Sequence, residues 1–203
     1  MRYIFWNIRG CGHAGRRTQL REYMFKERID FVALQETIKD DFSFRDLLAY
    51  DPLQRFDWFW TPSVGLSGGQ LMGCNKDVCD VILWESGSFH IAATVHHRVS
   101  LASWVIISVY GPTDHARSAE FLGELTALVG AKQASNLPVL VGGDFNLIRS
   151  GADKNNDNID WARVSLFNNA IASAALIEIA RTGARYTWTN KQREPVRCVL
   201  DRV

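Results

Sequence analysis

The chain has 203 residues, of which 47% are hydrophobic and 22% are charged, a composition typical of globular proteins with one or at most two domains. No apolar run is long enough for a membrane-spanning helix, and the N-terminus begins as a strand without a signal-peptide pattern. Four scattered cysteines lack the paired spacing of a metal site and predict buried free thiols. We therefore expect a protein of a reducing, intracellular compartment that has no contact with a membrane.

Charge is distributed unevenly along the chain, although the net charge is only +1. Residues 1–28 carry seven Lys/Arg against two Asp/Glu, residues 29–148 carry seven against fourteen, and residues 149–203 carry nine against six. An acidic middle with basic ends is consistent with a metal centre flanked by phosphate-contacting surfaces. It is equally consistent with solvated faces that have no such function.

Hydrophobic patterns predict an α/β protein in which strands and helices alternate at both ends of the chain, around a strand-rich middle. The predicted strands lie at 2–8, 31–37, 56–60, 79–84, 88–97, 101–110, 139–141, 185–189 and 197–203. The predicted helices lie at 16–28, within 38–55, at 114–133 and at 161–176. This order favours two mixed β-sheets packed face to face, with the helices outside.

The glycines at positions 65, 68, 69 and 73 form the densest glycine cluster in the chain. This segment lacks the lysine and the spacing of a phosphate-binding P-loop. We therefore predict that it forms a turn between strands.

The stretch from Pro138 to Asn146 begins as a buried strand and continues through two glycines to Asp144 and Asn146. On an extended backbone, residues two apart point to the same side, so this carboxylate and this carboxamide are expected to project together. The alternative is a glycine turn in which an Asx side chain bonds the backbone, with no catalytic function.

Four further polar side chains lie in an apolar strand or at its end: Asn7, Glu36, Tyr110 and Asp201. Polar groups are rare at such positions unless they are paired or bind a ligand. Together with Asp144 and Asn146 they make a set of six, which suggests a shared site.

The segments around these residues resemble the ordered motifs of the endonuclease/exonuclease/phosphatase superfamily, which includes DNase I-like and AP endonuclease-like enzymes. The segments are WNIRG (6–10), LQET (34–37), SVYGP (108–112), GGDFN (142–146), YTWTN (186–190) and LDRV (200–203). The sequences of these segments most resemble those of the endonuclease domain of plant LINE-type non-LTR retrotransposons. The resemblance covers nearly the whole chain and implies one domain over residues 1–203, folded as a four-layer αββα sandwich.

The resemblance implies a role for each residue in metal-dependent hydrolysis of a DNA phosphodiester to 3′-hydroxyl and 5′-phosphate ends. Glu36 would bind Mg²⁺, with Mn²⁺ as an alternative ion, and Asn7 would lie beside the ion. Asp144 would activate the attacking water, and Asn146 and Tyr110 would contact the water or the phosphate. Thr187 would hold the residues of the site in position without contacting the substrate itself.

Two departures from the family pattern bear on activity. Arg9 stands where AP endonuclease-like relatives often carry an acidic residue, which argues against a strict repair enzyme and suggests a contact to substrate instead. The family's Ser-Asp-His motif, whose histidine Asp201 would orient, lies beyond Val203. We therefore expect the 203-residue domain to lack its last C-terminal segment.

Three functions remain open at the level of sequence. The first is a DNA endonuclease that contacts the phosphate backbone, nuclear if it derives from a retroelement. The second is an inositol-phosphate or phospholipid phosphatase, or an RNA 3′-exonuclease, of the same superfamily. The third is a retroelement relic without catalysis. No protein partner can be inferred.

The missing histidine motif predicts that the 203-residue chain is a poor nuclease. A thousandfold loss in rate corresponds to about 4 kcal/mol of transition-state stabilisation. Nicking of supercoiled plasmid in Mg²⁺, with Asp144→Asn as the inactive control, measures this. Robust metal-dependent nicking by the wild-type chain would contradict the prediction.

Overall fold

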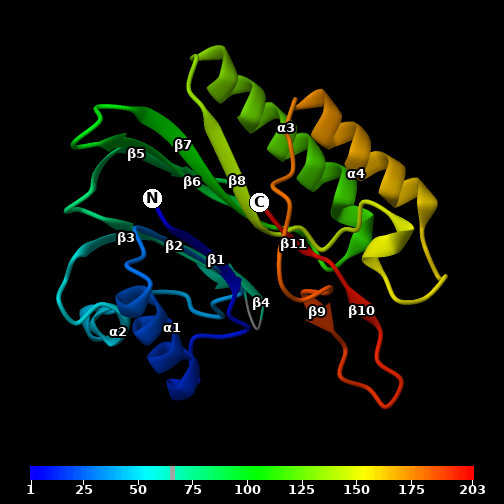
Figure 1. Ribbon diagram of the computed structural model, residues 1–203, viewed down its shortest axis with the longest axis horizontal. Coiled ribbons are helices and arrows are strands. Elements are labelled where there is room, and N and C mark those ends of the chain that lie inside the picture. Colours follow the sequence, from blue (N-terminus) through cyan, green and yellow to red (C-terminus); the bar gives the residue numbers. More distant parts are fainter. Residues whose placement is uncertain (65–66) are drawn as a thin grey trace.

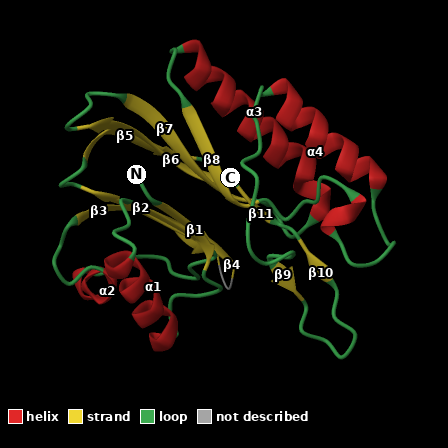
Figure 2. Cartoon of the chain, in the orientation of Figure 1, coloured by secondary structure: helices red, strands yellow, loops and turns green. Residues whose placement is uncertain are grey.

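The computed structural model describes residues 1–64 and 67–203. It shows two mixed β-sheets packed face to face, with helices on both outer faces (Figures 1 and 2). The predicted four-layer αββα sandwich is therefore confirmed. The first sheet has the order β1-β2-β4-β3, and its strands are β1 (Tyr3–Asn7), β2 (Phe31–Gln35), β3 (Phe56–Val64) and β4 (Ser67–Asn75).

The second sheet has the order β11-β8-β7-β6-β5. Its strands are β5 (Cys79–Ser86), β6 (His90–His97), β7 (Ser103–Tyr110), β8 (Val139–Asp144) and β11 (Asp201–Arg202). Each sheet contains one parallel pair, β1–β2 in the first and β7–β8 in the second. A short hairpin of β9 (Trp188–Thr189) and β10 (Arg197–Cys198) lies apart from both sheets (Figure 2).

Four α-helices cover the outer faces, two on each sheet (Figure 1). They are α1 (Ala14–Lys26) and α2 (Phe44–Tyr50) on the first sheet, and α3 (Ser118–Ala134) and α4 (Trp161–Ser173) on the second. Two single turns of 3₁₀ helix, η1 (His115–Arg117) and η2 (Gly151–Asp153), precede α3 and α4. The predicted N-cap of α4 is confirmed, since the Asp160 side chain accepts from the Arg163 amide, which satisfies one of the unpaired first-turn donors.

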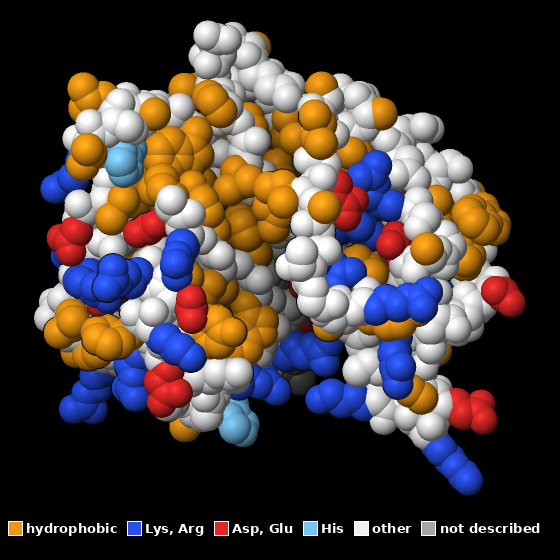
Figure 3. Space-filling view, viewed as in Figure 1, with side chains coloured by type: hydrophobic (Ala, Val, Ile, Leu, Met, Phe, Trp, Pro, Cys, Tyr) orange, Lys and Arg blue, Asp and Glu red, His pale blue; other side chains and the backbone are white. Residues whose placement is uncertain are grey.

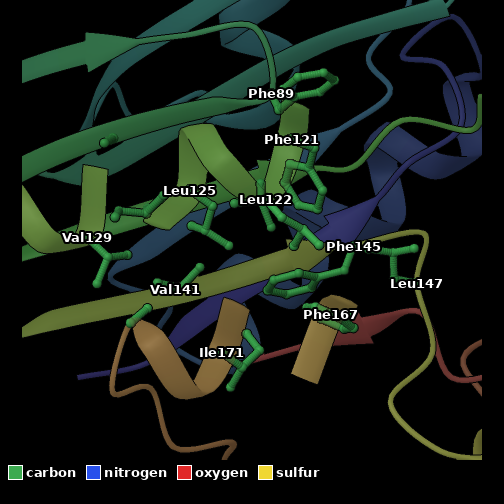
Figure 4. Packing of buried hydrophobic residues seen from close by; sticks show 14 of the residues in the cluster. Phe89, Phe121, Leu122, Leu125, Val129, Val141, Phe145, Leu147, Phe167 and Ile171 are labelled. Carbon is green, nitrogen blue, oxygen red and sulfur yellow. The ribbon is translucent and has the colours of Figure 1, made fainter. Parts of the chain in front are cut away.

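The core has three parts, as expected of a four-layer sandwich. The predicted apolar stripe of α3 packs with α4 on the outer face of β8, where Phe121 meets Phe145 and Phe145 meets Phe167 (Figure 4). A second cluster fills the space between α1, α2 and the first sheet. The third lies between the sheets, and all four cysteines are buried free thiols, as predicted.

The prediction of a turn at the glycine cluster is wrong for Gly68, Gly69 and Gly73, which belong to β4; Gly65 lies outside the described residues. This strand is central, pairing with both β2 and β3. Glycine is required because a Cβ at Gly73 would come within 2.5 Å of the Trp58 ring, and one at Gly69 within 2.4 Å of Thr37 Oγ1. The glycines therefore serve close packing in a strand.

The two C-terminal strands are shorter than predicted. Only Trp188–Thr189 of the segment 185–189 pairs as a strand, and the segment 197–203 is divided into β10 and β11. The division turns the chain from the hairpin back to the second sheet, where β11 pairs with the end of β8. No helix among the described residues is long and apolar enough to cross a membrane.

We predict that Gly73→Ala destabilises the fold by about 1–3 kcal/mol, because the added methyl group overpacks against Trp58. Gly130→Ala is the matched control, since a Cβ added at this position on α3 would have no neighbouring atom within 4 Å and alanine favours a helix by up to ~1 kcal/mol. Urea unfolding of both variants measures the difference. Equal stability of Gly73→Ala and the wild type would refute the packing argument.

Candidate active site

The parallel pairs β1–β2 and β7–β8 end at the same edge of the sandwich, one pair in each sheet (Figure 1). The strand register pairs Tyr110 with Asp144, and Asp144 with Asp201. Asn7 closes β1 and Glu36 follows β2. The structure thus brings these five predicted residues to one edge, with two of them contributed by the first sheet and three by the second.

Asn7 joins the two sheets directly. Its Nδ2 donates to Asp144 Oδ2 at 2.8 Å, and its Oδ1 accepts from the Arg9 amide at 3.1 Å. These two bonds fix which end of the Asn7 amide faces Asp144. Glu36 and Tyr110 also face each other across the sheets, close enough for the charge of Glu36 to raise the pKa of the Tyr110 phenol.

Thr187 holds Asp201 in place. Its Oγ1 accepts from the amides of Leu200 at 3.0 Å and Asp201 at 3.2 Å. These two bonds use both acceptor positions of the hydroxyl. Thr187 ties the loop before β9 to β11.

The extended backbone from which Asp144 and Asn146 were predicted to project together ends at Asp144. Strand β8 ends at Asp144, and Asn146 has a left-handed backbone with φ of 51°. The Asn146 amide donates to Asp144 Oδ1 at 2.9 Å, as in the Asx turn left open as the alternative, while its Nδ2 donates to Gly111 O at 2.7 Å. Its side chain lines a separate pocket with His115, Lys154 and Arg163.

Three of the ten described non-glycine residues with positive φ lie at this edge. Arg9, Glu36 and Asn146 have φ values of 50°, 55° and 51°, in the region that side-chain-bearing residues rarely adopt. Each follows the end of a strand by one or two residues. At Glu36 the left-handed turn breaks the alternation of β2, and its carboxylate contacts Tyr110 of the facing sheet. Strain of this kind is typical of functional sites.

An open cleft of about 410 Å³ lies in front of Asn7, Asp144 and Asp201. Glu36 and Tyr110 lie outside its lining, close enough to Asp144 for the charges to interact. The predicted residues Arg9 and Thr187 line it, and so do Arg16 and Lys191, which the sequence analysis did not single out. Figure 3 shows Lys and Arg side chains gathered along the lower side of the molecule, around the base of the cleft.

The two cleft cations that the sequence analysis missed come from segments far apart in the chain. Arg16 lies on α1 and donates from Nη1 to Ile8 O at 2.9 Å and also to Arg9 O, which secures the end of β1. Lys191 follows β9 in the hairpin. The basic N-terminal segment was the available signal for Arg16, but no sequence spacing places Lys191 opposite it.

Positive charge compensates the cleft carboxylates only in part, although Arg9 lowers the pKa of both. Burial and the charge of Asp144 raise the pKa of Asp201 to about 6, although Thr187 and the charge of Arg9 act to lower it. Burial also raises the pKa of Asp144, against the bonds from Asn7 and the Asn146 amide. Burial, followed by the charges of Glu36 and Asp144, raises the pKa of Tyr110, which therefore keeps its proton.

This donor set fits a hard divalent cation that keeps most of its water. The described residues contain no group of three or more His, Cys, Asp or Glu arranged to enclose an ion. Mg²⁺ commonly binds through one or two carboxylates together with waters and substrate phosphate. Glu36 and the side-chain oxygen of Asn7 meet that requirement, and a cation would relieve the repulsion among the neighbouring carboxylates.

We predict that Asp201→Asn stabilises the metal-free protein at pH 7 by on the order of 2–3 kcal/mol. The folded-state pKa of about 6 lies above the ordinary 3.8, so the folded state holds the Asp201 proton more tightly between these values, and the contribution of Asp201 to stability falls as pH rises from 4 to 6. Urea unfolding in EDTA at several pH values measures the difference in unfolding free energy between Asp201→Asn and the wild type. This difference should vanish below pH 4.

Asp160→Asn provides a control of opposite sign. Bonds from Arg163 lower the pKa of Asp160, so its contribution to stability is present at pH 7 and is lost as pH falls. An Asp201→Asn variant with the same pH profile as the wild type would show that Asp201 is not an uncompensated buried carboxylate.

Comparison with solved structures places the fold. The human Nocturnin catalytic domain, solved with a bound sulfate anion, matches with a TM-score of 0.68 and 15% identity over 100% of this chain and 81% of that one. The endonuclease domain of TRAS1, a telomere-specific non-LTR retrotransposon, matches with a TM-score of 0.67 and 12% identity, over 92% of this chain and 77% of that one. The Xenopus laevis APE2 catalytic domain matches with a TM-score of 0.61 and 17% identity, over 83% of this chain and 67% of that one.

At these identities the likeness shows the fold alone, and none of the curated proteins is a sequence match to this chain. A family model decides the wider assignment, since it matches residues 4–203 and so includes every residue of the candidate site. The chain belongs to the endonuclease/exonuclease/phosphatase family of hydrolases.

Proposed function

We propose that the chain is a divalent-metal-dependent DNA endonuclease of the non-LTR retrotransposon type, and that residues 1–203 form one domain. The observation that carries the proposal is the convergence of Asn7, Glu36, Tyr110, Asp144 and Asp201 at one edge, beside a cleft with a cationic lining. The reaction is hydrolysis of a phosphodiester to 3′-hydroxyl and 5′-phosphate ends.

Glu36 and Asn7 hold the metal, Mg²⁺ or Mn²⁺, in this proposal. The bound ion supplies stabilisation of the negative charge that develops on the phosphate. The left-handed turn at Glu36 supports the assignment, because it directs the carboxylate toward the second sheet.

Asp144 accepts the proton of the attacking water. Burial raises its pKa, which makes the carboxylate a stronger base than an exposed one. The bond from Asn7 to Oδ2 and the bond from the Asn146 amide to Oδ1 fix its orientation. Asn7 therefore has two tasks, beside the metal and as a support for the base.

The remaining residues bind and orient the substrate. Tyr110 keeps its proton because of the raised pKa of its phenol and donates to the phosphate. Arg9 contacts the phosphate backbone from the cleft wall. Asn146 contacts a phosphate oxygen from the neighbouring pocket, and Thr187 holds Asp201 beside Asp144. Water protonates the leaving 3′-oxygen.

The distribution of cations favours a polynucleotide over a small phosphate ester. Arg9 and Arg16 come from one wall of the cleft and Lys191 from the hairpin, so positive charge borders the cleft from two separate segments. A backbone of repeated phosphates can contact both at once. A retroelement endonuclease would act on chromosomal DNA, hence in the nucleus.

We predict that residual Mg²⁺-dependent nicking of supercoiled plasmid falls at least about 100-fold in Glu36→Gln and in Asp144→Asn, because each removes a charged group of the reaction. The two variants should differ in metal binding. Calorimetric titration with Mn²⁺ should show weakened affinity for Glu36→Gln and near wild-type affinity for Asp144→Asn.

Glu120→Gln is the matched carboxylate control, since Glu120 is exposed on α3 and pairs with Arg117 away from the cleft. It should bind Mn²⁺ and nick plasmid as the wild type does. Nicking that persists in EDTA or in Asp144→Asn would refute the proposal. Faster release of phosphate from an inositol polyphosphate than cleavage of DNA would favour the phosphatase alternative.

A further inference from the structure

Three polar side chains interrupt the apolar interface between the two sheets: Gln35 on β2, Gln70 on β4 and Ser108 on β7. Their exposed fractions are 0%, 4% and 0%. Gln35 Nε2 donates to Ser108 Oγ at 2.8 Å, and Ser108 Oγ donates to Gln70 Oε1 at 2.9 Å. This chain of two hydrogen bonds connects neighbouring strands of the first sheet to the centre of the second.

Packing alone does not require these residues. The rest of the interface is filled by side chains such as Phe31, Met72 and Ile106. Gln35 Oε1 is buried without a hydrogen-bond partner among the described residues, which costs stability that an apolar side chain of the same size would not cost. Replacement of a buried polar network by apolar residues often leaves a fold equally or more stable.

The network lies directly beneath the candidate site. Gln35 immediately precedes Glu36 and pairs in register with Asn7. Ser108 lies two residues before Tyr110, hence on the same face of β7, and the register pairs Tyr110 with Asp144. The three polar residues therefore connect the two sheets just inside the edge at which the site residues meet.

We infer that Gln35, Gln70 and Ser108 are positioning residues that fix how far one sheet can slide over the other at the site. Apolar contacts hold the sheets together but are non-directional, so they resist separation more than sliding. A hydrogen bond weakens steeply when its angle or distance departs from the optimum. The network thereby holds Glu36 and Asn7 at a set separation from Tyr110 and Asp144.

The inference rests on the proposed function, because a fixed separation matters for a reaction whose groups come from both sheets. The Asn7–Asp144 bond cannot maintain the separation alone, since both of its partners also bind metal or water in the reaction. Residues that take no part in the reaction can hold the separation and leave Asn7 and Asp144 free to bind metal or water.

The test is a triple variant, Gln35→Leu/Gln70→Leu/Ser108→Ala, which removes every side-chain polar atom of the network, including the Gln35 Nε2 that also donates to Ala33 O at 3.1 Å. We expect a melting temperature at or above that of the wild type. We also expect turnover of DNA and of bis(p-nitrophenyl) phosphate to fall about tenfold with KM unchanged, and Mn²⁺ affinity to fall. If the network were purely structural, turnover in the triple variant would change only as its melting temperature changes.

Two further variants sharpen the comparison. Ser108→Thr keeps the hydroxyl and should restore most of the turnover that Ser108→Ala loses. Ile106→Val, on the same strand and the same inner face, should lower the melting temperature and leave turnover unchanged. Wild-type turnover and wild-type Mn²⁺ affinity in the triple variant would overturn the inference.

A readout without metal or substrate separates this inference from the proposed function. NMR relaxation dispersion detects exchange on the μs–ms timescale. The triple variant should show it at Glu36, Tyr110 and Asp144, and the wild type and Ile106→Val should not. Failure of the wild type to bind Mn²⁺ would contradict the proposed function, while absence of this exchange would contradict the positioning role.

Discussion

The candidate site exists only because two separate sheets end their parallel strand pairs at the same edge. Strands β1 and β2 bring Asn7 and Glu36, and strands β7 and β8 bring Tyr110 and Asp144. Neither sheet alone carries the set. The apolar layer between the sheets and the polar network beneath the site are therefore parts of the site's geometry, as much as the residues that line the cleft.

Stability is lost at this edge in several ways at once. Left-handed backbone at Glu36 and Asn146 strains the chain, and burial with mutual repulsion raises the pKa values of Asp144 and Asp201. Proteins keep such features where function requires them and compensate elsewhere. The stabilising burial elsewhere in the fold includes the hydrophobic cluster of α3, α4 and the second sheet.

The sequence predicted the architecture well, because apolar periodicity and element order determine the layers. The burial of Leu125 and Val129 on α3 and the N-cap at Asp160 follow from local chemistry that a single segment contains. Strand β4 was missed because glycine usually marks a turn, and only the facing Trp58 ring and Thr37 explain why glycine is needed there.

The polar residues of the site could be found from the sequence, but their directions could not. A regular strand would direct Glu36 away from the second sheet and would align Asn146 with Asp144. The left-handed turns at Glu36 and Asn146 remove the extended backbone on which that geometry depends. The Gln35–Ser108–Gln70 network was invisible for a similar reason, since its partners come from three strands and meet only when the sheets pack.

The charge pattern of the chain gains a physical meaning once the cleft is assembled. The acidic middle of the sequence supplies Glu36 and Asp144, and the basic ends supply Arg9, Arg16 and Lys191, although Asp201 comes from a basic end. A phosphate drawn to the cationic wall meets buried carboxylates at the centre, which repel it when they are charged. In the proposed reaction, a cation bound between them would make the two halves of the cleft compatible with one phosphodiester.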